Sequence, residues 1–328
     1  MKYITFSIII ANHNDHDMVD RLLTHLFETD LNGCDKNYEI IIINDGSNQR
    51  YVLPDNYADH GSIKIYNRNY NLGVGSAFDY GVSRASGEYI VLMGADTYVS
   101  KKGWIGEAIA RFNDITTFGR GIMCFANKGD NPSIPGKHGL VRSGAEIVWK
   151  MDGTNVSSSH GQYGNVTYRD IIQAKWLPDN KLDLFPVPCI LGAVYLTTKS
   201  FYNHIAGFEG HRVWGGLEPL ISIKTWMAGA SCWVDKNIIT SHTYSRTSKT
   251  PDMHHYYANK IFIAQSLLRP DQSRALLKYF CNVSVRMEAL KLSYVYLYQK
   301  KELIEYLGAV LYQDVRDIEI LNYNDKED

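Results

Sequence analysis

The chain has no excess of charge of either sign. Its 34 Lys and Arg face 35 Asp and Glu, which gives a formal net charge of -1 with His neutral. Proteins that coat nucleic acid or an anionic membrane through bulk electrostatics carry a large charge of one sign, so this class is excluded, although a local basic groove is not. No apolar run approaches the roughly 20 residues that a transmembrane helix needs, and we therefore expect no membrane span.

Cysteine is scarce as well. The five cysteines are an odd number, lie far apart and include no CxxC pair: Cys34, Cys124, Cys189, Cys232 and Cys281. This pattern favours buried, reduced thiols over a disulfide framework. The apolar stretch Ile4–Ile10 is too short for the core of a signal peptide with its cleavage site, so it predicts a buried strand. Together these features predict a cytoplasmic protein.

The chain does have length and hydrophobic content. Its 328 residues, 45% of them hydrophobic, suffice for one large or two small domains. A core of that size needs no disulfide or metal ion to hold it together.

The first hundred residues alternate between strand and helix patterns. Apolar residues at helical spacing occupy Asp17–Phe27 and Ser76–Arg84. Around them stand runs rich in β-branched and aromatic residues, which are typical of strands buried on both faces. This βαβαβ order predicts an α/β fold with a mostly parallel, Rossmann-like sheet covered by helices on both faces. The predicted strands are Ile4–Ile10, Tyr38–Ile43, Ser62–Tyr66 and Tyr89–Met93.

Each of these predicted strands is followed by a polar segment rich in Asn, Asp and Gly. The segments are Asn12–Asp15, Asn44–Ser47, Asn67–Gly75 and Gly94–Thr97. Because ligands of open parallel sheets bind outside the carboxyl ends of the strands, we expect all four segments to line one crevice.

The central part of the chain is rich in Gly, Ser, Asn and Pro and has weak periodicity. Gly129–Gly139 and Gly153–Gly164 are predicted to be long loops with a functional role. A strand-like run at Pro188–Thr197 and a helical run at Leu217–Gly229 follow. Helical patterns dominate from about His255 onwards.

Five segments carry a resemblance to known enzymes: Ser7–Asn14, Ile41–Ser47, Asn69–Ala77, Ala85–Asp96 and Gly207–Glu218. The first four are similar to the nucleotide-binding half of family 2 glycosyltransferases of the GT-A type, and the fourth looks like the stretch that ends in the DxD motif of that family. The fifth resembles the WGG segment shared by polypeptide N-acetylgalactosaminyltransferases and β-1,4-galactosyltransferases.

This resemblance implies a division of the chain. Residues 1–250 would form a GT-A domain, with its nucleotide-binding half in residues 1–100 and its acceptor half in residues 186–250. Residues 101–185 would be a loop-rich insertion, and residues 251–328 a helical C-terminal region.

The resemblance also implies a divalent cation, Mn²⁺ or Mg²⁺, which would bridge the phosphates of a UDP-sugar donor and stabilise UDP as the leaving group. Carboxylate and imidazole ligands suit such an ion. Asp96 matches the metal-binding position of DxD, and His242 lies where the related enzymes place a second ligand. Gly94 replaces the first Asp of the motif, which removes a ribose contact. Without a metal ion, Asp96 would be a turn residue and His242 a hydrogen-bonded core histidine.

The strand ends and the resemblance together select the residues expected to contact the donor. Asp45 matches a turn whose carboxylates read uracil or ribose, although Asp-Gly is also simply a good turn. Trp214 offers a flat apolar face to a sugar ring, and Arg68 and Arg246 offer positive charge to the diphosphate. The full set is Asn12, Asp45, Arg68, Asn71, Gly73, Asp96, Trp214, Gly215, Gly216 and Arg246.

Glu218 is the expected catalytic base. An inverting transfer needs a carboxylate within hydrogen-bond reach of the acceptor hydroxyl. Glu218 is the second residue after the two glycines, the position of the base in β-1,4-galactosyltransferases, whereas the retaining enzymes have Glu at the position of Leu217. The resemblance therefore favours inversion. The alternative role for Glu218 is to cap the helix that runs through Leu220–Trp226, with Pro219 as its first residue.

The expected reaction is sugar transfer from a UDP-sugar to a hydroxyl of a glycan, a protein or a hydroxymethylated DNA base. Two other functions stay open. A nucleotidyltransferase would carry a Gly-rich loop with a basic residue after the first strand, where this chain has Asn12–Asp15. An inactive nucleotide-sugar-binding module would be consistent with Gly94.

Overall fold

The computed structural model describes residues 5–32, 37–129, 139–148, 172–178, 180–243, 253–271 and 300–311, with a few single positions between 273 and 299. Within these residues one 10-stranded sheet follows the order β10-β12-β6-β11-β4-β1-β2-β3, with β5 paired to β12 and β7 paired to β6. Strands β8 and β9 form a separate pair. The strands are β1 (Phe6–Asn12), β2 (Tyr38–Asp45), β3 (Ile63–Arg68), β4 (Tyr89–Gly94), β5 (Thr97–Val99), β6 (Gly121–Gly129), β7 (Val141–Arg142), β8 (Ala145–Val148), β9 (Gln173–Trp176), β10 (Leu184–Pro186), β11 (Val194–Thr198) and β12 (Ser231–His242).

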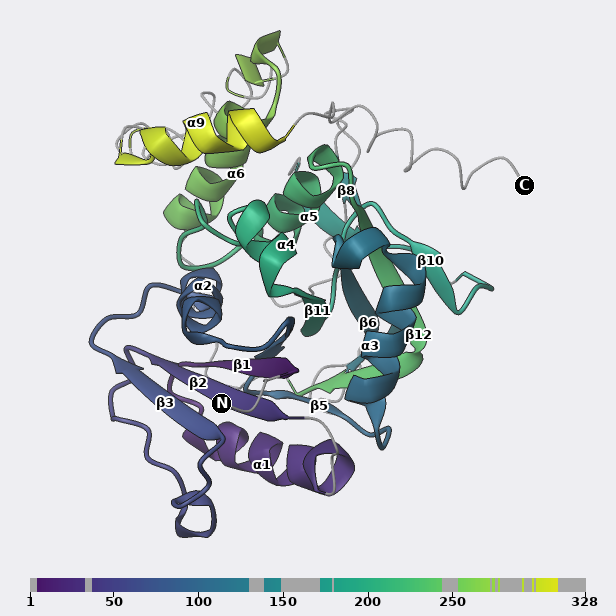
Figure 1. Ribbon diagram of the computed structural model, residues 1–328. Helices are drawn as coiled ribbons and strands as arrows, with labels where there is room; N and C mark the ends of the chain where they lie inside the picture. The colour runs from purple at the N-terminus through teal and green to yellow at the C-terminus, as the bar shows by residue number, and fades with distance from the viewer. Residues whose placement is uncertain are drawn as a thin grey trace.

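Helices cover both faces of this sheet. Figure 1 shows α1 and α2 on opposite sides of β1, β2 and β3, and α6 and α9 together at one end of the molecule. The α-helices are α1 (His16–Leu26), α2 (Val74–Arg84), α3 (Trp104–Ile115), α4 (Lys199–His204), α5 (Leu217–Met227), α6 (Met253–Leu267) and α9 (Lys301–Val310). The predicted α/β fold is thereby confirmed.

Strand β1 shows why the sequence folds in this way. Its side chains alternate between the two faces of the sheet, as the period of two in a strand requires. Ile8 and Ile10 are buried in the core that contains α1 and α3, whereas Ile9 is buried in the core that contains α2. A run that is apolar at every position therefore suits a strand with a helical layer on each side.

The parallel part of the sheet lies in the first hundred residues. Strand β1 pairs in parallel with β2 and β4, and β2 pairs in parallel with β3. Beyond β4 the pairing changes, because β11 lies antiparallel between β4 and β6 while β12 is parallel to β6. All strands of the parallel part end at the same edge, which is where the site lies.

The central region differs from the loop-rich insertion expected for it. Strand β6 lies inside the sheet between β12 and β11, and Met123, Cys124 and Phe125 are fully buried. Because the apolar run of β6 is short and lies between glycines, the sequence pattern does not mark it as a strand, although both of its faces are buried. The predicted loops at Gly129–Gly139 and Gly153–Gly164 lie almost entirely outside the described residues.

Two further elements carried no clear signal in the sequence. Helix α3 packs its apolar face, including Trp104 and Phe112, into the core on the α1 side. Strand β12 is irregular, because its register against β6 shifts between Asp235 and Ile239. Such a bulge breaks the alternation by which a long strand is recognised.

The C-terminal region is helical where the structure describes it, and α6 packs against both α5 and α9. Among the described helices, none combines the length and the apolar composition that crossing a membrane requires.

Candidate functional site

A ladder of side-chain amides joins the carboxyl ends of three parallel strands. Asn12, Asn44 and Asn67 occupy matching positions in the register of β1, β2 and β3. The Asn12 amide donates to Oδ1 of Asn44 at 2.9 Å, and the Asn44 amide donates to Oδ1 of Asn67 at 2.8 Å. Asn67 also accepts from the backbone amide of Tyr51 at 2.7 Å. Asn12 and Asn44 are buried, so this ladder forms a rigid polar floor below the edge of the sheet.

Asp45 holds the loop that follows β3. Its Oδ2 accepts hydrogen bonds from the backbone amides of Leu72 at 3.0 Å and Gly73 at 2.8 Å. Its Oδ1 lies 3.3 Å from Nη1 of Arg68, and the Asp45 side chain is only 4% exposed. Burial raises the pKa of Asp45, whereas the Arg68 charge and the two amides act in the opposite direction. Asp45 and Arg68 therefore set the shape of the loop from below.

Arg68 has other protein partners as well. Its Nη2 donates to Oγ of Ser76 at 3.1 Å, and its guanidinium lies 5.5 Å from the ring centroid of Tyr80. Asn71, which was expected to contact the donor, accepts from the Gly73 amide at 2.9 Å and is itself exposed.

Gly73 is the point at which the two halves of the site meet. It forms an isolated parallel bridge with Val213, and its φ is +92°. A Cβ at this position would lie 2.2 Å from the carbonyl oxygen of Val213. The close approach of the two backbones therefore requires glycine. It brings the loop before α2 against the loop that carries Trp214.

Asp96 and His242 lie side by side at the same edge. Nε2 of His242 is 3.1 Å from Oδ2 of Asp96, and the side chains are 24% and 19% exposed. The sheet creates this pair, because His242 at the end of β12 is opposite Thr97 in β5. A second contact, from the Thr243 amide to the Asp96 carbonyl at 3.0 Å, holds the two segments together.

The pair offers one carboxylate and one imidazole to a cation. The described residues contain no cluster of three or more His, Cys, Asp or Glu side chains suited to a metal ion. A metal ion held by Asp96 and His242 would therefore need further ligands, such as phosphate oxygens and water.

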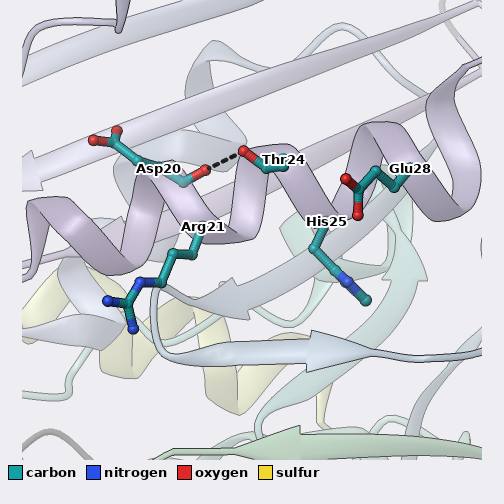
Figure 2. Close-up of a pocket in the computed structure, with 5 residues that line it drawn as sticks. All are labelled: Asp20, Arg21, Thr24, His25 and Glu28. Atoms are coloured by element: carbon teal, nitrogen blue, oxygen red, sulfur yellow. Dashed lines mark hydrogen bonds between the residues drawn. The ribbon is translucent and has the colours of Figure 1, made fainter.

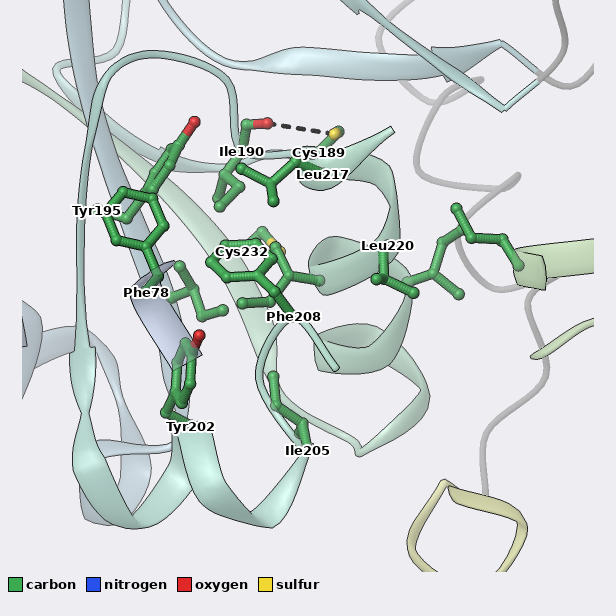
Figure 3. Close-up of a cluster of buried hydrophobic side chains, with 14 of the residues drawn as sticks. Phe78, Cys189, Ile190, Tyr195, Tyr202, Ile205, Phe208, Leu217, Leu220 and Cys232 are labelled. Atoms are coloured by element: carbon green, nitrogen blue, oxygen red, sulfur yellow. Dashed lines mark hydrogen bonds between the residues drawn. The ribbon is translucent and has the colours of Figure 1, made fainter. Parts of the chain in front are cut away.

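Glu218 lies in the first turn of α5, and its Oε1 accepts a hydrogen bond from the hydroxyl of Tyr195 at 3.2 Å. The same hydroxyl lies 2.8 Å from the carbonyl oxygen of Gly192. Burial raises the pKa of Glu218, whereas a backbone hydrogen bond and the Tyr195 hydroxyl lower it. Figure 3 shows Tyr195 and Leu217 within one buried cluster, so the carboxylate lies next to a dry core.

The neighbours of Tyr195 place Glu218 near the end of β4. Val194 in β11 is opposite Met93 in β4, and the Gly94 amide lies 3.5 Å from the Ala193 carbonyl oxygen. Gly94 directly precedes the segment that carries Asp96. The sheet thus brings the Glu218 side of the site and the Asp96 side to one edge.

Trp214, Gly215 and Gly216 form the loop that leads into α5. The Trp214 indole is 44% exposed and stacks on the ring of Tyr256 with 5.7 Å between centroids. Gly215 and Gly216 have φ values of +87° and +80°, which explains why glycine occupies both positions. The remaining residue expected to contact the donor, Arg246, lies outside the described residues.

Two residues of this arrangement are not revealed by the sequence: Tyr195, and Asn259 of α6, whose side chain hydrogen-bonds to the backbone of Arg212, Trp214 and Gly215. Tyr195 is one apolar-looking position in a predicted strand, and Asn259 lies in a helical run far from the motifs. Neither position stands out by spacing or by composition, so only an alignment of related chains would have marked them.

A separate surface hollow lies along α1 and the π-helical turn that follows it, Phe27–Leu31, and is lined by Asp20, Arg21, Thr24, His25 and Glu28. Figure 2 shows these five side chains along a single helix, with the Thr24 hydroxyl donating to the Asp20 carbonyl. None of the residues discussed above lines it. The hollow is shallow and open, and we assign it no part in the site.

Comparison with known proteins gives a family match for part of the chain and a fold for most of it. Residues 7–142 match the model of Glycosyl transferase family 2. An uncharacterized glycosyltransferase of Synechocystis sp. is 35% identical over 95 residues, which make up 28% of this chain and 30% of that protein. The chain therefore matches less than a third of the length of this relative, and the family resemblance expected from the sequence is confirmed for the N-terminal region.

Two solved structures extend the likeness beyond that region. A crystal structure of GalNAc-T7 with UDP, GalNAc and Mn²⁺ has a TM-score of 0.68 at 14% identity, covering 98% of this chain and 58% of that one. S. aureus TarS in complex with UDP-GlcNAc has a TM-score of 0.51 at 14% identity, covering 80% of this chain and 66% of that one. At this level of identity the likeness establishes the fold, which is of the GT-A type.

Proposed function

We propose that this chain is a glycosyltransferase that moves a sugar from a UDP-sugar donor to an acceptor hydroxyl. The proposal starts from the GT-A fold and from the match of residues 7–142 to glycosyl transferase family 2. The observation that carries the proposal is the meeting of three groups at one edge of the sheet. These are the Asp96–His242 pair, the loop that Asp45 holds, and the carboxylate of Glu218.

The donor side is supported by backbone geometry. The loop before α2 presents its turn at the carboxyl edge, and the amides of Leu72 and Gly73 are fixed by Asp45. We assign the diphosphate to the space between this loop and the Trp214 loop, whose backbones meet at Gly73 and Val213. Asp45 acts in this proposal by holding the loop, and the nucleoside would rest above the amide ladder that Asn12 begins.

Asp96 and His242 would hold Mn²⁺ or Mg²⁺. Both side chains are partly exposed and close enough to share one ion, and carboxylate oxygen is a ligand that both cations accept. When bound, such an ion supplies Lewis-acid stabilisation of the charge on the leaving diphosphate. Gly94, where the related motif has Asp, leaves Asp96 as the acidic ligand of this segment.

Glu218 would act as the base of an inverting transfer. Its carboxylate removes the proton of the acceptor hydroxyl while that oxygen attacks the anomeric carbon and the bond to the UDP oxygen breaks. The raised pKa of Glu218 suits this task, because a stronger base takes the proton more readily near neutral pH. Single displacement on the face opposite UDP inverts the anomeric configuration, which NMR of the product would report.

The identities of the acceptor and of the transferred sugar depend on the side chains that line the pocket, and the fold alone does not determine them. Glycans, proteins and hydroxymethylated DNA bases all offer the hydroxyl that the reaction needs. A UDP-release assay that combines several UDP-hexoses and UDP-N-acetylhexosamines with each acceptor class, in the presence of Mn²⁺, tests them side by side.

Thermal unfolding with UDP tests the donor and metal parts of the proposal. We expect UDP to raise Tm more in the presence of Mn²⁺ than in its absence, and we expect Asp96→Asn and His242→Gln to remove that difference. Asp59→Asn, at an exposed turn before β3, is the control for a lost carboxylate. A Tm that does not respond to UDP with Mn²⁺ would contradict the assignment.

Substitution of the proposed base separates an enzyme from a binding module. Glu218→Gln should retain UDP binding and lower turnover at least about 100-fold, because general base catalysis contributes that much. Glu28→Gln, at an exposed position just after the end of α1, is the matched control. Equal turnover in Glu218→Gln and wild type would exclude Glu218 as the base. UDP binding with no transfer by wild type to any acceptor would favour a nucleotide-sugar-binding module.

A further inference from the structure

The Trp214 loop, residues 212–216, has a backbone conformation that its own side chains do not stabilise. Val213 has a φ of +52° although it is β-branched, and Gly215 and Gly216 also have positive φ. A branched side chain in the left-handed region is strained, so something outside the loop must hold it there. The loop leads directly to Glu218, which makes its conformation matter for the site.

One side chain of α6 supplies the missing contacts. Oδ1 of Asn259 accepts from the backbone amide of Arg212 at 2.9 Å. Its amide nitrogen faces three carbonyl oxygens, those of Arg212 at 2.8 Å, Gly215 at 2.8 Å and Trp214 at 3.2 Å. Asn259 is only 3% exposed, so water cannot take over these contacts. A buried amide that both donates and accepts is the group that such a loop needs.

Neighbouring positions of the same helix complete the contact. Tyr256 is one turn before Asn259 and stacks on Trp214, and a Cβ on Gly215 would lie 2.1 Å from its ring. Nζ of Lys260 lies 4.3 Å from the centroid of the Tyr256 ring. Positions separated by three and four residues share one face of a helix, so α6 presents a single surface to the loop.

A second contact fastens the loop from within. Nε2 of His211 lies 3.0 Å from the Gly215 carbonyl oxygen, and burial lowers the pKa of His211 to about 4. The ring is therefore neutral at physiological pH, and it donates through Nε2.

We propose that Asn259 is a positioning residue of the site: from α6 it holds residues 212–215 in their strained conformation, and so it sets where Trp214 and Glu218 stand. The inference gives the C-terminal region a part in the active site, beyond that of an appended helical layer. Its structural part stands on the contacts above, and its effect on turnover rests on the proposed glycosyltransferase function.

Hydrogen exchange of the wild-type protein tests the structural part. The Arg212 amide, which donates to the Asn259 side chain, should exchange as slowly as the backbone amides of α6. Exchange at the rate of an open loop would overturn the inference, and this measurement needs no variant to fold.

Asn259→Asp tests the positioning directly. The substitution preserves size but places a carboxylate against three carbonyl oxygens, so the loop should be released. We expect at least tenfold faster exchange at Arg212 and at least tenfold lower kcat/KM for the acceptor. UDP binding should also weaken, because the released loop forms one side of the proposed diphosphate site. Asn203→Asp, on the exposed face of α4, makes the same chemical change without these contacts and should behave as wild type.

The outcomes separate the inference from the proposed function. Wild-type exchange and wild-type kinetics in a folded Asn259→Asp protein would overturn the inference. If wild type transfers no sugar, the proposed function fails while the exchange measurements still decide the role of Asn259. If Asn259→Asp does not fold, Asn259→Ser retains a hydroxyl that donates to one carbonyl and should show an intermediate exchange rate. A wild-type exchange rate in that variant would also overturn the inference.

Discussion

The hydroxyl of Tyr195 lies 3.2 Å from Oε1 of Glu218, and this contact joins a buried strand to the proposed base. Tyr195 is 3% exposed, and Glu218 is partly buried. The hydroxyl stabilises the charged form of Glu218 and opposes the effect of burial on its pKa. The balance between these two effects sets the pH at which the base can work.

Tyr195→Phe should therefore shift the pH dependence of transfer. Loss of the donor raises the pKa of Glu218 further, so the rising limb of kcat/KM should move to higher pH. Because the lost hydrogen bond is to a charged group, we expect kcat/KM of the variant on that limb to be about tenfold lower than that of wild type at the same pH. A pH profile of kcat/KM measures the shift, and activity should recover at high pH.

Tyr89→Phe is the control for this shift, because its hydroxyl bonds to Asn113 away from the site. A Tyr195→Phe profile that coincides with wild type would show that the hydroxyl does not tune Glu218.

The raised pKa of Glu218 also predicts a link between pH and stability. A carboxyl group whose pKa is higher in the folded state than in the unfolded state binds its proton more tightly when folded. Its contribution to stability is therefore present at low pH and is lost as pH rises through the folded-state pKa. Glu218→Gln removes this loss while preserving size.

We expect Glu218→Gln and wild type to have similar Tm values at about pH 4 and the variant to be about 2 °C or more higher at about pH 8. Differential scanning calorimetry at both pH values measures this. A difference in Tm that does not grow with pH would contradict a raised pKa of Glu218 in the folded state.

Gly73→Ala should break the junction between the two loops. The new Cβ would overlap the carbonyl oxygen of Val213, and φ would remain positive. We expect a loss of about 2 kcal/mol or more in the free energy of unfolding, together with weaker UDP binding. Urea denaturation and UDP titration measure the two effects.

Gly61→Ala is the matched control for the junction, since a Cβ there meets nothing within 4 Å. Equal stability and equal UDP affinity in Gly73→Ala and Gly61→Ala would mean that the two loops need not touch.

Asn44→Asp, which places a second carboxylate beside Asp45, should disturb the amide ladder. The Asn44 amide donates to the carbonyl of Gln49 at 3.0 Å and to Asn67, and a carboxylate cannot donate to either. Asn44 is 1% exposed, so we expect a loss of about 2 kcal/mol or more in the free energy of unfolding near neutral pH. Chemical denaturation measures it.

Asn48→Asp, at an exposed position of the same turn, controls for the added charge. An Asn44→Asp protein as stable as this control would show that a carboxylate fits the ladder.

Local patterns determined which part of the chain would form the site. Apolar strands such as Tyr38–Ile43 end in Asn and Asp, and parallel strands must end at one edge, so the clustering of Asn12, Asp45 and Asp96 follows from chain order alone. The family resemblance then proposed Glu218 and His242. The sequence could not show β6 or β12, because the apolar run of β6 is short and lies between glycines and a bulge interrupts the alternation of β12.

Tertiary structure decided what each of these side chains touches. Asp45 is turned to the backbone of Leu72 and Gly73, and His242 reaches Asp96 only because β12 pairs with β5. Tyr195 and Asn259 enter the site through contacts between elements that are distant in the chain. Such contacts depend on sheet register and helix packing, which are set by the burial of the whole core and by no single segment. The sequence by itself therefore determined the edge at which chemistry can occur, and the fold decided which groups meet there.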